Sequence, residues 1–186
     1  MSRDEKSLLV LFGLAGLGAW LYFSRAGQSL ITATSSTIES GVEKLADITN
    51  STLNLIKSYE GFSSKPYPDA RGWSIGYGHF MGTQPTMQEI SESVAYGLLR
   101  NDVQTSADAI RAAVKVPLTQ NQFDALASLA YNIGANAFRN STLVRLLNAG
   151  DYDGAVAQFA VWRNSSGKVN KVLVQRRADE AAVFIS

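Results

Sequence analysis

Residues that could do chemistry gather in one short stretch, GWSIGYGH, which runs from Gly72 to His79. Its Gly-x-Ser-x-Gly core matches the nucleophile elbow of serine hydrolases, in which Ser74 would be the nucleophile. That mechanism needs a strand-turn-helix setting and a histidine that follows an acidic partner. The single histidine of the chain, His79, comes five residues after Ser74 and is expected on the same strand. This arrangement argues against a serine hydrolase.

Two ligand-binding chemistries also fit this stretch poorly. GYGHFMG lacks the third glycine of the dinucleotide fingerprint, and no helix clearly starts there. One histidine without a second histidine or any cysteine makes a poor metal site. We therefore expect no cofactor and no metal, and we expect His79 to make a structural hydrogen bond at the strand end.

Large and small side chains alternate along the same predicted strand, so its two faces differ. The bulky face carries Trp73, Ile75 and Tyr77, and the other face carries Ser74, Gly76 and Gly78. A nearly bare face lets a bulky ligand approach the backbone closely, as the wall of a cleft must. We interpret the stretch as one wall of a binding cleft.

A carboxylate, Glu60, lies in the last turn of a short helix predicted from STLNLIKSYEGF. Gly61 ends this helix, and its apolar positions are Leu53, Leu55, Ile56 and Tyr59. The helix dipole disfavours a negative charge at the C-terminus, which suits a side chain that donates a proton. Two interpretations remain open at this point, a general acid and an ordinary solvated glutamate.

Composition limits the domain count and the classes of partner. The chain has 186 residues, 46% of them hydrophobic, which is enough for one sizeable core and a tail. A net charge of +1 lacks the basic excess of a dedicated nucleic-acid binder. Without cysteines, the fold must hold by packing in any redox compartment.

The N-terminal segment 7–24 carries no charged residue and is expected to insert into a membrane. As a helix it would span roughly 26 Å, against about 30 Å for a bilayer core. Its aromatic end favours an uncleaved anchor over a cleaved signal peptide, and a buried soluble helix is a further alternative. Arg3 and Lys6 precede the segment and Arg25 follows it, which weakly places the rest of the chain outside the cytoplasm.

Three regions follow from these patterns. Residues 1–27 form the membrane-inserting segment, and residues 28–50 read as a helical linker or stalk with apolar residues about seven apart. Residues 51–186 form the predicted catalytic domain. Docking of the linker helix onto that domain explains its apolar stripe as well as a stalk does.

Several motifs together resemble the phage-type lysozymes, the muramidase endolysins of bacteriophages. They are YEGF, KPYPDARGWSIGYGH, LTQNQFDALASLAYNIGANAF, STLVRLLNAGD and VQRRADE, and the resemblance covers about residues 51–186. It implies a catalytic set of Glu60, Asp69 and Ser74, with Ser74 at a position where the family usually has threonine. The chain also has four residues, where five are usual, between Asp69 and that hydroxyl.

This resemblance implies hydrolysis of the β-1,4 bond between N-acetylmuramic acid and N-acetylglucosamine in peptidoglycan. Such a reaction needs one carboxyl that donates a proton and one carboxylate that acts on water or the sugar. Glu60 would be the acid, and Asp69, in a polar loop beside Ser74, would hold or activate the water. The family is inverting, which implies carboxyl groups about 6.5 to 9.5 Å apart.

The resemblance also places Phe80, Tyr131, Ser141 and Gln158 where substrate-contacting residues lie. Each has an ordinary structural alternative, respectively hinge packing, core packing, a helix N-cap and a solvated helix position. We interpret the charged residues of the last helix as a solvated ion-pair face; they are Arg176, Arg177, Asp179 and Glu180.

The remainder of the chain is predicted to be helical. Thr86-x-x-Glu89 and Thr119-x-x-Gln122 read as capping boxes, which start helices with apolar residues at Ile90, Val94, Leu98 and at Phe123, Leu126, Ala130. Gly134 and Gly150 mark helix ends, and further helices are expected from residue 151 and over 171–185. The predicted fold class is α+β, with a small β-hairpin lobe, a larger helical lobe and a cleft between them.

Three functional classes stay open: a muramidase, a lytic transglycosylase and an inactive wall-binding or virion structural protein. Asp69 and Ser74 favour the muramidase, since a transglycosylase needs no water-holding group. Residues 7–24 resemble the signal-anchor-release segment of some endolysins. The expected role is lysis of the host cell by a monomeric catalytic domain in the periplasm, tethered to the inner membrane or released from it. Attachment to a virion membrane, for use in entry, is the alternative.

Overall fold

A computed structural model describes residues 46–69 and 72–186 of the chain, which form one compact unit from Ala46 to Ser186. The predicted membrane-inserting segment, and the linker up to residue 45, lie outside the described residues. Within the described range, no helix combines the length and the apolar character needed to cross a membrane. Fold and site are therefore those of residues 46–186.

The unit begins five residues before the domain boundary expected at Ser51. Asp47 anchors this start, because its carboxylate accepts a hydrogen bond of 2.6 Å from Arg111 and its backbone oxygen accepts one of 2.8 Å from Gln120. Helix α2 (Asn50–Glu60) follows at once and buries Leu53 and Ile56. Gly61 ends it with a φ of 65°, so Glu60 is its last residue, as predicted.

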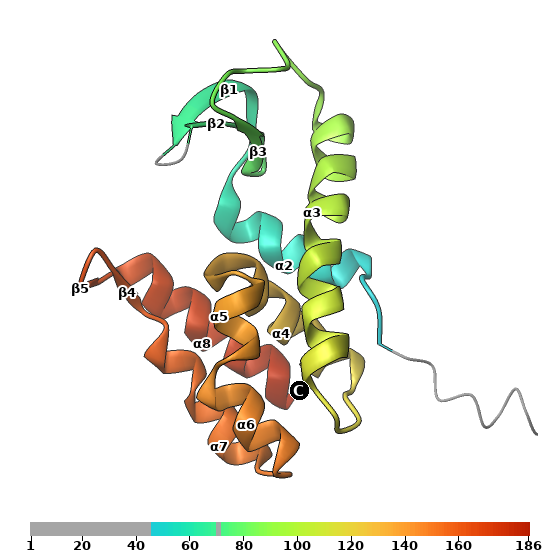
Figure 1. Cartoon of the computed structure of the whole chain (residues 1–186), viewed down its shortest axis with the longest axis vertical. Coiled ribbons are helices and arrows are strands. Elements are labelled where there is room, and N and C mark those ends of the chain that lie inside the picture. Colours follow the sequence, from blue (N-terminus) through green and yellow to red (C-terminus); the bar gives the residue numbers. More distant parts are fainter. Residues whose placement is uncertain (1–45, 70–71) are drawn as a thin grey trace, which may run out of the picture. The chain divides into compact units, whose positions relative to one another are not determined.

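A small antiparallel sheet follows α2 and lies at one end of the unit (Figure 1). Its strands, in spatial order, are β1 (Ser63–Asp69), β2 (Gly72–Gly76) and β3 (His79–Gly82). The predicted hairpin thus has a third strand. Strand β2 ends at Gly76 and a turn at Tyr77 and Gly78 starts β3, so the prediction of one strand from Trp73 to His79 was wrong.

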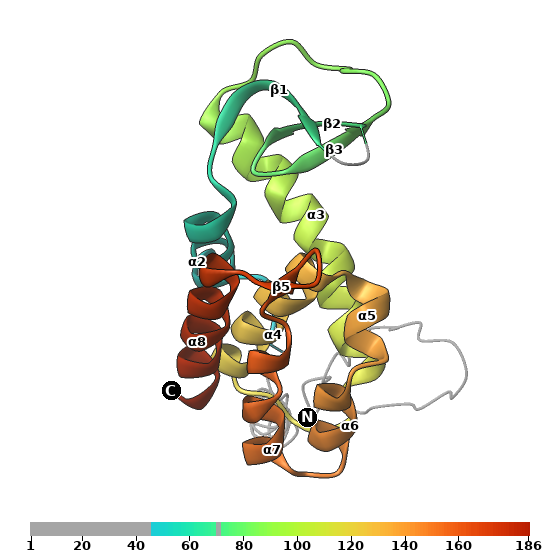
Figure 2. The same cartoon turned by 90° about the vertical axis from the view of Figure 1, so that its left-hand side faces the viewer.

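Helix α3 (Glu92–Ala113) runs from the sheet into the helical lobe (Figure 2). The capping box predicted at Thr86 does not start it; Ser91 is the N-cap, and its hydroxyl accepts from the Val94 backbone. The predicted apolar stripe is also shifted, since Val94 is 49% exposed whereas Ala95, Leu99 and Val103 are buried. Three of the seven residues that α3 buries are alanines, which a search for large apolar residues overlooks.

The helical lobe packs around α4 (Gln120–Ile133), whose residues 123–130 are all buried. A helix buried on every side is a core helix. The predicted capping box is confirmed, because Thr119 accepts from the Gln122 backbone and the Gln122 side chain accepts from the Thr119 backbone. Gly134 caps its C-terminus, as expected.

Short elements complete the lobe and cover α4. They are α5 (Ala135–Arg139), α6 (Thr142–Asn148), α7 (Tyr152–Ala157), the 3-10 turn η1 (Phe159–Val161), the hairpin of β4 (Asn164–Ser165) and β5 (Lys168–Val169), and α8 (Lys171–Ile185). The last helix has the predicted bounds. The hairpin of β4 and β5 was not predicted.

Candidate active site

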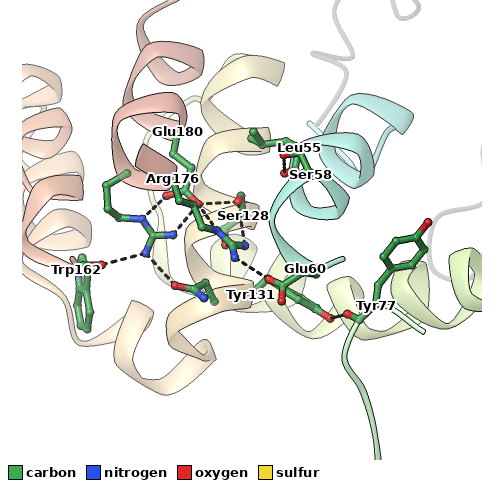
Figure 3. A network of polar contacts seen from close by, with 11 residues as sticks. Leu55, Ser58, Glu60, Tyr77, Ser128, Tyr131, Trp162, Arg176 and Glu180 are labelled. Atoms are coloured by element: carbon green, nitrogen blue, oxygen red, sulfur yellow. Dashed lines mark hydrogen bonds and ion pairs between the residues drawn. The ribbon is translucent and has the colours of Figure 1, made fainter. Parts of the chain in front are cut away.

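Glu60 meets a buried arginine at the end of α2. Nη1 of Arg176, on α8, lies 2.6 Å from Oε1 of Glu60, and the Arg176 side chain is only 3% exposed (Figure 3). The Glu60 side chain is 22% exposed, so one part of the carboxyl is held by the protein and another reaches solvent. Such a carboxyl is available to a ligand without being free to move.

The interpretation of the charged residues on α8 as a solvated face was wrong for three of them. Arg176, Arg177 and Glu180 are each at most 2% exposed. Glu180 accepts hydrogen bonds from Nε of Arg176 at 3.1 Å, from Nη2 of Arg177 at 2.8 Å and from the Ser128 hydroxyl at 2.6 Å. Nε of Arg177 also lies 2.7 Å from its Oε2, as an ion pair. A buried charge needs such partners, because transfer out of water is costly.

The fourth member of that set, Asp179, takes a different role. Its carboxylate accepts hydrogen bonds from the Tyr59 hydroxyl and from Gln175 at the surface of α8. Burial and the nearby carboxylate raise the pKa of Tyr59 to about 12. This contact ties α8 to α2 one residue before Glu60.

Asp69 and Ser74 lie together, at the end of β1 and in the middle of β2. The Ser74 hydroxyl donates to Oδ2 of Asp69, and the Gly72 backbone N–H donates to Oδ1 at 3.1 Å. Asp69 is thus the last strand residue, paired with Gly72, and not a loop residue as expected. The shortened turn between the two functional groups leaves their contact in place.

Tyr67 connects the two carboxylates electrostatically. It lies on β1 opposite Ser74. The pKa of its hydroxyl is raised by burial first, then by the negative charges of Glu60 and Asp69. Sequence reasoning did not select Tyr67, because a single tyrosine between two prolines carries no recognisable pattern.

A pocket of about 320 Å³ adjoins Glu60, and it includes two of the predicted substrate-contacting residues. The wall residues come from five elements or turns; they are Glu60, Gly78, Phe80, Asp102, Tyr131 and Asn132. The sequence predicted Phe80 and Tyr131 but missed Asp102 and Asn132. Polar residues scattered over different helices converge only through the tertiary fold.

The glycines of the predicted bare face differ in what they meet. A Cβ atom at Gly78 would lie 3.8 Å from the Tyr131 hydroxyl and 4.0 Å from Oε2 of Glu60, so this backbone does face the pocket. At Gly76, in contrast, a Cβ atom would lie 2.9 Å from Cβ of Ala95. Gly78 therefore leaves space in the pocket, whereas Gly76 allows α3 to pack closely against β2.

Two hydrogen bonds hold the turn and strand that border the pocket. The Tyr131 hydroxyl donates to the Tyr77 carbonyl at 3.1 Å, and burial, with the charge of Glu60, raises the pKa of that hydroxyl. Nδ1 of His79 lies 2.9 Å from Asp102, which confirms the structural hydrogen bond predicted for this histidine. Both contacts fix the sheet against the helical lobe beside Glu60.

Ser141 and Gln158 do not line the pocket beside Glu60. The Ser141 hydroxyl caps α6 by accepting from the Val144 backbone, which is its structural alternative, and it borders a separate depression of about 480 Å³. Gln158 is half-buried between α7 and η1. Within residues 46–69 and 72–186, no three acidic or histidine side chains gather in a way that could hold a metal ion.

Comparison with known proteins shows the family. The family model described as phage lysozyme matches residues 57–180. The chain belongs to the phage lysozyme family. This match includes Glu60, Asp69 and Ser74, as well as the arginines of α8.

Relatives and solved structures support the assignment. The chain is 46% identical over 142 residues to the endolysin of Bacillus phage PZA, covering 75% of this chain and 55% of that protein. It is 33% identical over 158 residues to the SAR-endolysin of Enterobacteria phage P21, covering 84% of this chain and 96% of that protein. The muramidase domain of SpmX from Asticaccaulis excentricus superimposes with a TM-score of 0.70 at 35% identity, covering 75% of this chain and 98% of that domain.

These matches differ in how much of each protein they cover. The chain spans only about half the length of the endolysins from Bacillus phages PZA and B103. The match to the P21 protein covers 84% of this chain, more than Ala46–Ser186 provides, and so includes residues before Ala46. Similarity to that relative is therefore not confined to the folded unit.

Proposed function

We propose that the protein is a muramidase that hydrolyses the β-1,4 bond between N-acetylmuramic acid and N-acetylglucosamine in bacterial peptidoglycan. The observation that carries this proposal is the pair of differently held carboxylates. Glu60 borders the pocket and pairs with Arg176, whereas Asp69 accepts from a hydroxyl and a backbone N–H. Two carboxyl groups in different surroundings are what glycoside hydrolysis requires.

In this proposal Glu60 is the general acid. It donates a proton to the glycosidic oxygen as the bond from that oxygen to the anomeric carbon breaks, and the second sugar leaves with that oxygen as a free hydroxyl. The carboxylate that remains is stabilised by the ion pair with Arg176. The partial exposure of Glu60 lets a proton return from solvent between turnovers. General acid catalysis of this kind contributes roughly 10² to 10⁴ in rate.

Asp69 and Ser74 have the task of placing the attacking water. A carboxylate with one oxygen bonded to Ser74 and the other to Gly72 keeps a fixed orientation and still has lone pairs that can accept from water. Water then attacks the anomeric carbon from the side opposite the leaving oxygen and passes one proton to the Asp69 carboxylate, which inverts the configuration at that carbon. Asp69 returns this proton to solvent before the next turnover. Phe80 and Tyr131, which line the pocket, are proposed to contact the sugar, and Ser141 and Gln158 to contact more distant parts of the glycan.

We also propose that residues 7–24 hold the enzyme at the host inner membrane, with the folded unit in the periplasm, until lysis. The likeness to the SAR-endolysin of phage P21, which extends before Ala46, supports this assignment. The proposed anchoring rests on the uncharged segment 7–24 and on the similarity to that relative. The alternative is attachment to a virion membrane.

Analysis of digestion products tests the proposed reaction. Purified peptidoglycan is incubated with the protein, and the released fragments are identified by mass spectrometry. Hydrolysis gives reducing N-acetylmuramic acid ends, which carry one more water than the 1,6-anhydro ends that a lytic transglycosylase leaves. Fragments with anhydro ends would overturn the water-based mechanism, and intact peptidoglycan would overturn the enzymatic function.

A further inference from the structure

Four buried or half-buried charges form one chain of contacts beneath the candidate acid (Figure 3). Arg176 contacts Glu60 through Nη1 at 2.6 Å and Glu180 through Nε at 3.1 Å. Glu180 in turn contacts Arg177 at 2.7 Å. Two guanidinium groups thus face two carboxylates, and the set is neutral when Glu60 is ionised.

Glu180 has no route to solvent and no contact with Glu60 of its own. It is 0% exposed, and Ser128 holds it in place by donating a hydrogen bond of 2.6 Å. Arg177 reaches Glu180 from the other side and donates to Asn132, a pocket residue, at 3.1 Å. Glu180 therefore acts on the site through the arginines.

We propose that Glu180 is a positioning residue that fixes Arg176 against Glu60 and offsets the charge of the two arginines, so that Glu60 can hold the proton it donates. This inference rests on the proposed role of Glu60 as general acid. It assigns a function to a carboxylate that does not touch the substrate pocket.

The physical reason is the balance of buried charge. Arginines stay protonated. Without Glu180, Glu60 would be the carboxylate left in the cluster to neutralise the charges of Arg176 and Arg177. A net positive surrounding favours the ionised form of Glu60 and opposes its protonation. Burial raises the pKa of Glu180, and the contacts with Arg177, Ser128 and Arg176 oppose that rise. The two guanidinium groups at 2.7 and 3.1 Å are the partners that favour its charged form.

Other titratable groups lie near Glu60 and Glu180, and the test variants must leave them unchanged. Around Glu60 the pocket and sheet carry Asp102, Tyr131, Tyr67 and Asp69, and next to Glu180 lies the pair of Tyr59 with Asp179. None of these groups bonds directly to Glu180 among the described contacts. Variants at Glu180 and Arg177 therefore leave the other groups in place.

Three variants give opposite predictions for the pH dependence of peptidoglycan hydrolysis. At low substrate, the alkaline limb of the profile reports loss of the proton from the acid of the free enzyme. Glu180→Gln keeps the shape and removes one negative charge, so the alkaline limb should move to lower pH by about one unit. Arg177→Met removes one positive charge and should move the limb to higher pH. The double variant restores the balance and should return the limb toward its original position.

Asp179→Asn is the matched control, because it removes the neighbouring carboxylate of α8, which does not bond to Arg176. Its alkaline limb should stay where it is in the unmodified protein. Coincident limbs in the unmodified protein and in Glu180→Gln would overturn the inference. If Glu180→Gln alone does not fold, the inference is tested by Arg177→Met and by the double variant. The alkaline limb should move to higher pH in Arg177→Met and return when Glu180→Gln is added, and a merely structural role of Glu180 predicts neither result.

Carbon NMR separates failure of this inference from failure of the proposed function. The side-chain carboxyl carbon of Glu60, assigned by its disappearance in Glu60→Gln, is titrated in the unmodified protein and in the variants without substrate. Shifts of the titration midpoint in the predicted directions support the inference even if the protein cleaves no glycan. Unchanged midpoints overturn it even if the protein is an active muramidase.

Discussion

The contact between Asp69 and Ser74 forms although only four residues separate them in the sequence. It forms because Asp69 closes β1 in register with Gly72, at the start of β2, and Ser74 follows two residues later. Strand pairing thus brings the hydroxyl to the carboxylate. The pair of residue types could be predicted from the sequence, whereas their register depends on backbone hydrogen bonds.

Removing either partner should impair turnover more than binding. Asp69→Asn weakens the acceptor for water, and Ser74→Ala removes the hydroxyl that orients the carboxylate, so both should lower kcat about 10-fold to 1000-fold with a smaller change in KM. Initial rates of release of soluble fragments from peptidoglycan, over a range of substrate concentrations, measure this split. Ser74→Thr is the control, since it keeps the hydroxyl, and it should retain activity. A change in KM alone would reassign the residue to sugar binding.

The secondary-structure elements α2, the sheet and α3 position the site. Some of their features could be predicted from the sequence and others could not. The end of α2 at Gly61 and the start of α4 at Thr119 were predictable, because a glycine and a capping box act locally. The buried face of α3 was not predictable, because alanines make up much of it. The sequence that resembles a capping box at Thr86 lies in a segment that is not helical.

The buried charges of α8 were also beyond sequence reasoning. A run of alternating charges is usually a solvated face, and the partners that bury Arg176 lie 116 residues away at Glu60 and 48 residues away at Ser128. The pattern QRRADE shows four charges and gives no hint of which turn toward the core. Long-range contacts of this kind depend on how α4 and α8 pack.

The close approach of β2 to α3 gives a prediction with an internal control. Gly76→Ala should lower the free energy of unfolding by about 2 kcal/mol or more, because φ is +66° and the added methyl would lie 2.9 Å from Cβ of Ala95. Gly82 has a φ of +96° but nothing within 4 Å of its Cβ position, so Gly82→Ala measures backbone strain alone and should cost less. Urea unfolding of both variants checks the order. Equal losses would contradict a packing role for Gly76.

In the chain as a whole, the folded unit resembles other members of the phage lysozyme family, and an uncharged segment, residues 7–24, precedes it in the sequence. Gly13, Gly16 and Gly18 make the segment only weakly hydrophobic. Each buried CH₂ contributes about 0.8 kcal/mol, so leucines at these positions would hold a membrane-inserted helix far more strongly. A weakly held anchor is what the proposed release from the membrane would need.

Replacement of the three glycines by leucine should therefore keep the protein in the membrane fraction and delay lysis. The unmodified chain should divide between membrane and soluble fractions as a full-length protein, with more of it soluble after the membrane potential collapses. Fractionation with intact-mass measurement checks both. Full-length protein that stays in the membrane under every condition would contradict release, and a soluble species without its first 26 residues would show a cleaved signal peptide.

The rate of glycan cleavage by Glu60→Gln shows most directly whether Glu60 is the acid of a peptidoglycan hydrolase. The change keeps the size of the side chain and its contact with Arg176 but removes the transferable proton. We predict that release of reducing ends from peptidoglycan falls about 100-fold or more, with the fold intact by circular dichroism. Glu89→Gln, an exposed carboxylate away from the pocket, should retain its rate. A folded Glu60→Gln protein that cleaves within a few-fold of the unmodified rate would contradict the role of Glu60 as the general acid.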